Sequence, residues 1–354
     1  MKEFGSEFNI GVLPNDYFDN LYNSFSSSHL LRSGREAIYL AARSIDKCSR
    51  SNATVALLPA YCCWSMEFPF SSAGYQIEYY KLNADLTIDK EFLDYQISAH
   101  HPSCILLVNY YGFTPTKNIA SHIKNNYPTV YTIEDFSQNL FALEIDNNID
   151  IYVASIRKSV GVPDGGIILS NTPCTEEIKE YDTHFVEHRL QAEILKSQYQ
   201  YSNEQASKDK LRNLLSQSVD WLNNNFAPYK MSDISRNIIN HLDIKTICFA
   251  RQFNYSHLFE LLKGNHNIEI IFEPTADNKS PFAMPILINE RDKAQQTLAQ
   301  AGVFAPLLWP ITNKAAHVCP VSKRMTENML ALPIDQRYDY FDIEEMGRRI
   351  NQVM

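Results

Sequence analysis

The chain has 354 residues, which is enough for about two domains and for a central sheet that is buried on both faces. Its formal net charge of -9 argues against a nucleic-acid-binding protein, because phosphate backbones are bound through clustered Lys and Arg. The composition, 45% hydrophobic and 21% charged, is that of a globular protein, and no apolar run reaches the ~18 residues that a membrane span needs.

The N-terminal residues and the cysteines bear on the compartment. Lys2, Glu3 and Glu7 interrupt the N-terminus, which has no apolar stretch of the kind that a secretory signal needs. The seven cysteines are an odd number without a C-x-x-C spacing, which fits a reducing compartment better than a disulfide framework. We therefore expect a cytoplasmic protein that binds neither membranes nor nucleic acid.

From residue 54 onward, short β-rich runs alternate with helical patterns. Such alternation predicts an α/β fold with a mostly parallel central sheet covered by helices. Several runs, such as Cys-Ile-Leu-Leu-Val at 104–108, are apolar at every position, as expected of strands that are covered on both sides. The predicted strands are residues 54–59, 76–82, 104–110, 129–134, 149–155 and 166–170.

The second half of the chain changes in character. Residues 175–227 are polar and largely helical in pattern, which indicates an elaboration outside the sheet, and a further helix is predicted over 232–250. The remaining residues have the pattern of a smaller α/β domain, with strands at 268–273 and 283–288 and helices at 291–301 and 343–353. The predicted organisation is an N-terminal segment 1–30, a large domain 31–250 and a small C-terminal domain 251–354.

Ser33-Gly34-Arg35-Glu36 precedes an amphipathic helical pattern and has the S-x-x-E form of a capping box. One interpretation is a helix start and nothing more, which this stretch by itself favours. The other is a phosphate site, in which backbone N–H groups and the positive end of the helix dipole bind the anion while Gly34 permits its close approach.

Asp135 and Gln138 follow a predicted strand and therefore lie at the carboxyl end of the sheet, where open α/β proteins build their sites. Asp135 either caps the next helix or binds a ligand. If that ligand is pyridoxal 5'-phosphate (PLP), a carboxylate keeps its pyridine nitrogen protonated, so that the ring accepts electrons from a carbanion. Gln138 would then reach the phenolic oxygen.

Lys158 lies in a turn rich in Pro and Gly between two predicted strands, at 156–166. A lysine in a turn is usually a solvated surface residue. Here it would share a sheet edge with Asp135, and the nearby Ser155 could contact a phosphate. A lysine that is partly desolvated beside a cationic cofactor has a lowered pKa, which is the usual condition for Schiff-base formation.

Taken in order along the chain, these stretches resemble the DegT/StrS sugar aminotransferases of PLP fold type I, in the aspartate aminotransferase superfamily. The resemblance covers residues 30–350, and it is the order and spacing of the motifs that is specific. The motifs are Ser-Gly-Arg at 33–35, Leu-Pro-Ala-Tyr at 58–61, Glu-Asp-x-x-Gln at 134–138, Ser-x-x-Lys with Pro-Asp-Gly-Gly at 155–166, Met-Ser-Asp-Ile at 231–234 and Leu-Pro-Ile-Asp-Gln-Arg-Tyr at 332–338.

The resemblance implies a homodimer whose site draws residues from both subunits. It implies transfer of an amino group, commonly from glutamate, to a keto-sugar attached to a nucleotide, as in the biosynthesis of surface polysaccharides. Lys158 would hold PLP as a Schiff base and then move the proton between the substrate α-carbon and the cofactor C4', while Asp135 tunes the ring. The residues implied at the phosphate are Ser33, Gly34, Arg35 and Ser155.

The sequence departs from the family pattern around the ring. Many members place an aromatic residue over PLP where this chain has Cys63, and the neighbouring Tyr61 and Trp64 are candidates that we expect to be core residues rather than stacking ones. Asn-Tyr-Tyr-Gly at 109–112 replaces the usual His-x-x-Gly, so substrate contacts there are expected to differ.

A second departure concerns the family's Asn-x-Arg-Met segment, which reaches across the dimer. It reads Pro-Tyr-Lys-Met at 228–231, so the asparagine is missing and Lys230 stands in place of the arginine. Lys230 either replaces the lost phosphate contact as a point charge or is a solvated residue at a helix start.

Other functions stay open from sequence alone. One is a different PLP enzyme, such as a lyase, a desulfurase-like enzyme or an amino-acid aminotransferase, and another is a non-catalytic relative that uses the fold for binding or regulation. Lys158 argues against the family's dehydratases, which carry histidine there. The sequence has no H-E-x-x-H motif or paired C-x-x-C motif, which argues against metal catalysis. It also has no Walker A or G-x-G-x-x-G motif, which argues against nucleotide hydrolysis and dinucleotide redox chemistry.

Overall fold

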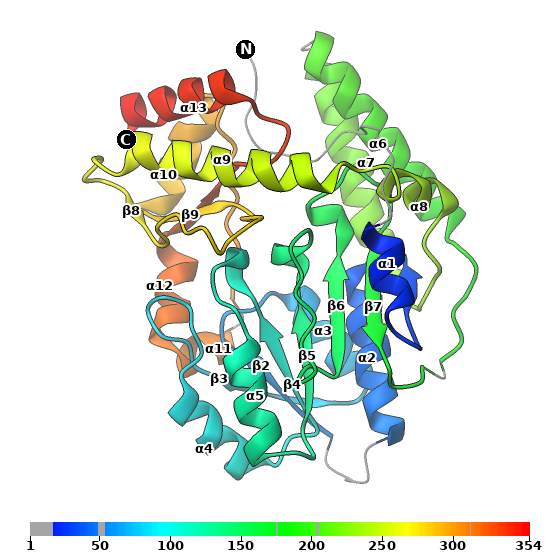
Figure 1. Ribbon diagram of the computed structural model, residues 1–354. Helices are drawn as coiled ribbons and strands as arrows, with labels where there is room; N and C mark the ends of the chain where they lie inside the picture. Colours follow the sequence, from blue (N-terminus) through cyan, green and yellow to red (C-terminus); the bar gives the residue numbers. More distant parts are fainter. Residues whose placement is uncertain (1–16, 49–53, 175, 203–204, 312) are drawn as a thin grey trace. The chain divides into compact units, whose positions relative to one another are not determined.

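The computed structural model describes residues 17–48, 54–174, 176–202, 205–311 and 313–354 (Figure 1). The strands are β1 (His29–Leu31), β2 (Val55–Pro59), β3 (Gln76–Tyr80), β4 (Cys104–Val108), β5 (Tyr131–Asp135), β6 (Ile151–Ser155), β7 (Gly166–Ser170), β8 (Glu269–Ile270), β9 (Met284–Leu287) and β10 (Met329–Leu332). They form a seven-stranded sheet in the order β1-β7-β6-β5-β4-β2-β3 and a three-stranded sheet in the order β10-β9-β8.

Helices separate most of these strands. The α-helices are α1 (Tyr17–Asn23), α2 (Gly34–Cys48), α3 (Trp64–Ser72), α4 (Lys90–His100), α5 (Lys117–Asn126), α6 (Thr183–Ser202), α7 (Gln205–Asn224), α8 (Asp233–Ile239), α9 (Ile244–Leu262), α10 (Arg291–Gln300), α11 (Asn313–Val318), α12 (Pro320–Asn328) and α13 (Tyr340–Val353). Short 3-10 turns are η1 (Tyr110–Gly112), η2 (Ser137–Asn139) and η3 (Ile156–Lys158). None of the described helices combines the length and the apolar character that crossing a bilayer requires.

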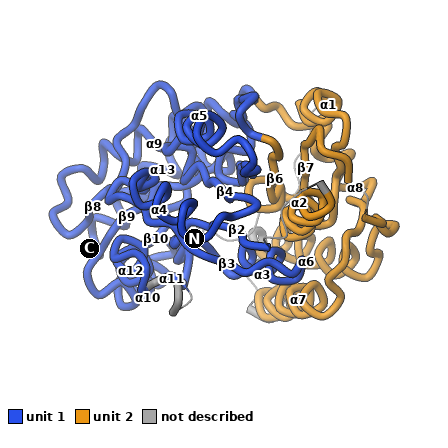
Figure 2. Tube along the Cα trace, turned by 90° about the horizontal axis from the view of Figure 1, so that it is seen from below, with its two compact units in different colours: residues 1–6, 51–149, 245–354 blue, residues 7–50, 150–244 orange. Residues whose placement is uncertain are grey.

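The described residues form two compact units, and each unit is built from separate stretches of sequence (Figure 2). The first contains the described parts of residues 51–149 and 245–354, and the second those of 7–50 and 150–244. These units cut across the predicted domains 31–250 and 251–354, which rest on sequence patterns and stay a prediction.

The first unit contains the parallel part of the seven-stranded sheet. β3, β2, β4 and β5 pair in parallel, with α3, α4 and α5 in the connections between them. β4 is buried at every position, and β2 at every position after its first. Strands that are apolar throughout bury both faces, so the predicted α/β class with a mostly parallel sheet is confirmed.

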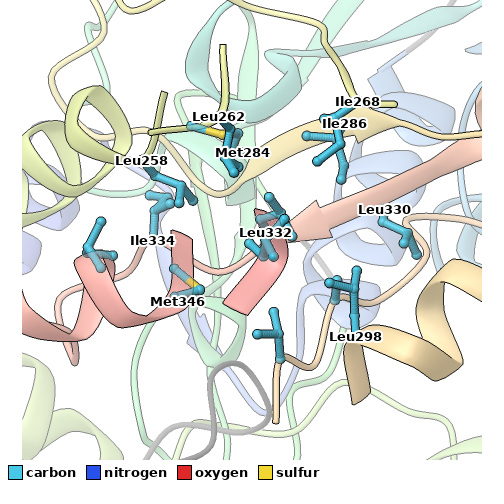
Figure 3. Close-up of a cluster of buried hydrophobic side chains, with 14 of the residues drawn as sticks. Leu258, Leu262, Ile268, Met284, Ile286, Leu298, Leu330, Leu332, Ile334 and Met346 are labelled. Atoms are coloured by element: carbon cyan, nitrogen blue, oxygen red, sulfur yellow. The ribbon is translucent and has the colours of Figure 1, made fainter. Parts of the chain in front are cut away.

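A second core of the first unit surrounds the antiparallel sheet β10-β9-β8. Apolar side chains from this sheet pack with those of the helices α9, α10 and α13 (Figure 3). The predicted strands and helices of the C-terminal region are therefore present, although β8 is shorter than its apolar run. The labelled core residues are Leu258, Leu262, Ile268, Met284, Ile286, Leu298, Leu330, Leu332, Ile334 and Met346.

The second unit contains the antiparallel pairs β1–β7 and β6–β7. The predicted helical elaboration is the pair α6 and α7, which pack on one another around Ala192, Leu211 and Leu214. The helix predicted over 232–250 is wrong, because α8 ends at Ile239 and a new helix, α9, starts at Ile244. The break falls on Asn-His-Leu-Asp at 240–243, where Asn, His and Asp are weak helix formers.

Candidate active site

The residues expected at the site divide between the two units. Trp64, Asp135 and Gln138 belong to the first unit. Ser33, Gly34, Arg35, Ser155, Lys158 and Lys230 belong to the second.

In the second unit, the start of α2 lies against the end of β6. A Cβ atom added to Gly34 would come within 2.9 Å of the Ser155 Cβ, so glycine is what allows the two segments to approach. Ser33 Oγ accepts the backbone N–H of Glu36 at 3.5 Å, which is the contact expected of a capping box. The structure thus brings Ser33, Gly34 and Ser155 together at a helix N-terminus, the arrangement that binds phosphates elsewhere.

A buried arginine that sequence reasoning missed anchors this helix start. Arg32 is fully buried, and its Nε and Nη2 donate to Glu36 Oε1 at 2.8 and 2.5 Å. Arg32 Nη1 also donates to Asp182, whose carboxylate caps the first turn of α6 by accepting the Phe185 N–H at 3.1 Å. Burial raises the pKa of Glu36 to about 7, although the Arg32 charge acts in the opposite direction. The signal in the sequence was the charged Arg32 directly after the apolar Leu30-Leu31 and before the Ser33 motif.

Lys158 ends η3 in the loop between the antiparallel strands β6 and β7, where its side chain is half-buried. The loop is closed at its base, because the Ile156 N–H donates to the Gly165 carbonyl at 3.1 Å. The Gly165 N–H in turn donates to the Arg32 carbonyl at 2.8 Å. The predicted turn rich in Pro and Gly therefore packs against the backbone that leads into Ser33.

The two basic residues expected near the phosphate have partners within their own unit. Arg35 Nη1 donates to Asn223 Oδ1 at 2.6 Å, and Lys230 Nζ donates to Glu180 Oε1 at 2.5 Å. Lys230 and Glu180 are both exposed. Lys230 is not at a helix start, since α8 begins only at Asp233 and Lys230 forms a backbone bridge with Leu31.

In the first unit, Asp135 is the buried last residue of β5. Its Oδ1 accepts the Ser137 N–H at 2.9 Å, so the carboxylate shapes the turn into η2, whose N-cap residue is Phe136. Gln138 is also buried, and its Oε1 accepts the Tyr111 N–H at 2.6 Å. Gln138 Nε2 is buried and has no hydrogen-bond partner among the described residues. A buried donor without an acceptor is costly, so this amide fits a bound acceptor.

The backbone held by Gln138 is unusual. Tyr111 has a φ of 55°, a left-handed conformation that costs energy for a residue with a bulky side chain. Its carbonyl accepts the Phe282 N–H at 3.2 Å, which fixes the conformation from the other side. The departure from the family pattern at 109–112 thus coincides with a backbone that its neighbours hold in place.

The stacking candidates differ in their surroundings. Tyr61 is a fully buried core residue, as expected, and its ring lies 5.7 Å from that of Tyr110 and 5.6 Å from that of Trp309. The expectation that Trp64 is core is wrong, because the side chain is 45% exposed at the first turn of α3. Its ring centroid lies 4.6 Å from that of Phe68, its neighbour one turn along the helix.

No family model matches the sequence, and no curated protein sequence matches it. Solved structures do match in fold over nearly the whole chain. An aminotransferase described as DegT/StrS from Brucella abortus has a TM-score of 0.66 at 15% identity, covering 96% of this chain and 91% of its own. The PseC aminotransferase of pseudaminic acid biosynthesis from Helicobacter pylori has 0.66 at 13%, covering 99% of each chain. The chain has the fold of the sugar aminotransferases.

A further structure with this sugar-aminotransferase fold is a putative sugar aminotransferase from Streptococcus pneumoniae in its PMP form. Its TM-score is 0.67 at 12% identity, and the match covers 97% of this chain and 91% of that one. The expected class, PLP fold type I, is therefore confirmed as a fold.

Proposed function

We propose that the protein is a PLP-dependent aminotransferase that moves an amino group, from a donor such as glutamate, to a keto-sugar carried by a nucleotide. The observation that carries the proposal is the buried Gln138 Nε2, a donor without an acceptor that follows Asp135 at the end of β5. A pyridine ring with a phenolic oxygen on one side and a ring nitrogen on the other needs such a donor and such a carboxylate.

Each unit by itself carries residues that fit one part of the cofactor. Asp135 would hold the proton of the pyridine nitrogen, and Gln138 would donate to the phenolic oxygen. Ser33, Gly34 and Ser155 would bind the phosphate through hydroxyls and the N-terminal N–H groups of α2, which are already close together. When bound, PLP supplies an electron sink for the carbanion that forms when the substrate loses a proton.

Lys158 has the central part in this proposal. Its Nζ is the amine that would hold the cofactor covalently and, once displaced by the amino donor, would carry the proton between the substrate α-carbon and the cofactor C4'. The loop closed by Ile156 and Gly165 limits how far the lysine moves between these tasks. A constrained loop favours proton transfer because the reacting atoms stay in reach.

The phosphate and the ring have further candidates. Arg35 would add positive charge after turning from Asn223, and Trp64 offers an exposed ring at the start of α3. We propose a homodimer in which Lys230 leaves Glu180 to reach the phosphate or the substrate in the partner subunit. The Lys230–Glu180 pair is exposed, and surface ion pairs contribute little to stability. Lys230 can therefore leave Glu180 with little loss of free energy.

The setting of the reaction belongs to the same proposal. The odd number of cysteines supports a reducing, cytoplasmic location. The resemblance to the sugar aminotransferases favours the biosynthesis of surface polysaccharides, which we propose as the pathway.

The test is the visible absorbance of the purified protein before and after borohydride, followed by peptide mapping. We expect reduction to fix a pyridoxyl group on Lys158. Addition of glutamate should then convert unreduced protein to the pyridoxamine form. A label on another lysine would contradict the assigned role, failure to react with amino donors would point to a different PLP enzyme, and absence of PLP binding would leave a non-catalytic protein.

A further inference from the structure

Asp164 is a fully buried carboxylate in the same loop as Lys158. Its Oδ2 accepts the Ser232 N–H at 2.8 Å, and its Oδ1 accepts the Ser232 hydroxyl at 2.6 Å. The Ser235 hydroxyl also donates to Oδ1. Ser232 is the residue that caps α8, so the carboxylate binds the loop to the first turn of that helix.

The segment that Asp164 binds is the one that carries Lys230. This segment runs from Tyr229 to Ser235, and its backbone is tied to the strand before the Ser33 motif. The Arg32 N–H donates to the Tyr229 carbonyl at 2.9 Å, and the Met231 N–H donates to the Leu30 carbonyl at 3.1 Å.

These contacts connect three segments of the second unit in a ring. The segments are the Lys158 loop, the Lys230 segment and the residues that lead into Ser33. Gly165, next to Asp164, completes the ring by donating to Arg32 and by forming a bridge with Ser33. Asp164 is the side chain at the junction between the loop and the Lys230 segment. Without the carboxylate, the 3.4 Å hydrogen bond from the Asp164 N–H to Ser235 Oγ would remain at this junction, so the ring would be weakened there while its other contacts stay.

The charge state of Asp164 depends on these donors. Burial raises its pKa, whereas the hydrogen bonds from Ser232 and Ser235 and the charge of Arg157 lower it. A buried carboxylate is tolerated when several donors satisfy it, and such hydrogen bonds are among the stronger ones in proteins. The contact thus resists separation of the two segments.

We propose that Asp164 is a positioning residue that holds the Lys158 loop and the Lys230 segment in one arrangement for the cofactor. In this proposal Asp164 acts through Ser232 and Ser235, which its carboxylate contacts, and not through the cofactor. This inference rests on the proposed function in taking PLP as the ligand. The coupling between the two segments is a property of the chain without any ligand.

The variants follow from the geometry. Asp164→Ala removes all three acceptor contacts. Asp164→Asn is the conservative variant, because its carbonyl oxygen can accept the Ser232 N–H while the serine hydroxyls turn to accept from its amide. Ser235→Ala removes one hydroxyl, and Ser218→Ala is the matched control, since it removes a buried hydroxyl that donates to the Leu214 carbonyl within α7.

The first measurement is amide hydrogen exchange of the protein without PLP, followed in peptides covering 156–166 and 228–236. We expect Asp164→Ala to exchange about tenfold faster in both peptides together, Ser235→Ala to do so more weakly, and Asp164→Asn to restore most of the protection. Ser218→Ala should leave both peptides unchanged. Faster exchange in one peptide alone, or equally throughout the chain, would overturn the coupling.

The second measurement uses the PLP-loaded protein. We expect Asp164→Ala to lower kcat about tenfold or more, with the KM for the amino donor little changed and Asp164→Asn close to wild type. Equal kcat in wild type and Asp164→Ala would overturn the positioning role. A wild-type protein that binds no PLP would instead contradict the proposed function, and the exchange measurement would still report on the coupling.

Discussion

Gly166 lies so close to Ser33 that a Cβ atom on it would come within 2.2 Å of the Ser33 carbonyl oxygen. The neighbour is backbone, which cannot turn aside as a flexible side chain can. Gly166 is therefore required for the loop of Lys158 to return beside the start of α2.

We expect Gly166→Ala to lower the free energy of unfolding by about 2 kcal/mol or more, because the strand must move away from Ser33. Chemical denaturation followed by circular dichroism measures the change. Gly264→Ala is the control, since a Cβ there meets no atom within 4 Å and should change the stability by less than about 0.5 kcal/mol. Equal stabilities of the two variants would contradict the close packing at Gly166.

Asp135→Asn tests the carboxylate at the proposed ring nitrogen. The amide keeps an oxygen for the Ser137 N–H, so the turn after β5 and the fold should be retained. Turnover should fall by about 100-fold or more, because a neutral amide cannot stabilise the protonated ring nitrogen. Steady-state kinetics with matched melting temperatures gives the answer, and turnover near that of wild type would remove the assigned role.

Glu134 gives a pH dependence of stability. Burial raises its pKa to about 7, and the nearby charges of Asp135 and Asp146 add to this, while the hydrogen bond from Thr116 opposes it. Between the ordinary pKa of 4.5 and about 7, the folded protein holds a proton that the unfolded chain has lost. The stability from this group is therefore full below that window and is lost as the pH rises through it.

The prediction is that Glu134→Gln flattens this dependence, because the amide stays neutral and still offers an oxygen to Thr116. Urea denaturation at about pH 5 and about pH 8, at constant ionic strength, should show a smaller loss of stability in the variant than in wild type. An identical loss in both proteins would mean that Glu134 is not protonated in the folded state.

The cross-subunit role of Lys230 is tested with mixed dimers. Co-expression of Lys158→Ala and Lys230→Ala chains gives heterodimers in which one site has both lysines and the other has neither, so activity should partly return. Size exclusion and mass spectrometry establish that heterodimers are present. A mixture of such heterodimers that is no more active than its inactive parents would show that Lys230 acts only within its own chain.

The sequence predicts the elements whose pattern is local. β4 is apolar at each position, and β7 follows a turn that is rich in glycine. Both strands can therefore be predicted without knowing which strands they pair with. The order of the motifs also predicted that Ser33, Gly34 and Ser155 lie close together. By contrast, the break at 240–243 depends on a few weak helix formers between two helical patterns, and periodicity continues across it.

The partners of charged residues could not be predicted. Arg32 meets Asp182 and Lys230 meets Glu180 only because segments far apart in the sequence are brought together. The exposure of Trp64 is of the same kind, since it depends on which side of α3 is covered. Local patterns say that a residue is charged or aromatic, and the tertiary contacts decide what it does.

The division of each compact unit between distant stretches also dictates when it can fold during synthesis. The described strands and helices of the second unit have been synthesised once residue 244 has left the ribosome, whereas the first unit then still lacks α9 to α13 and the three-stranded sheet. Its parallel strands must wait for those partners through the synthesis of the whole last third of the chain. Long-range pairing of this kind is slow and leaves apolar surface open, so the nascent first unit is where we expect chaperones to bind.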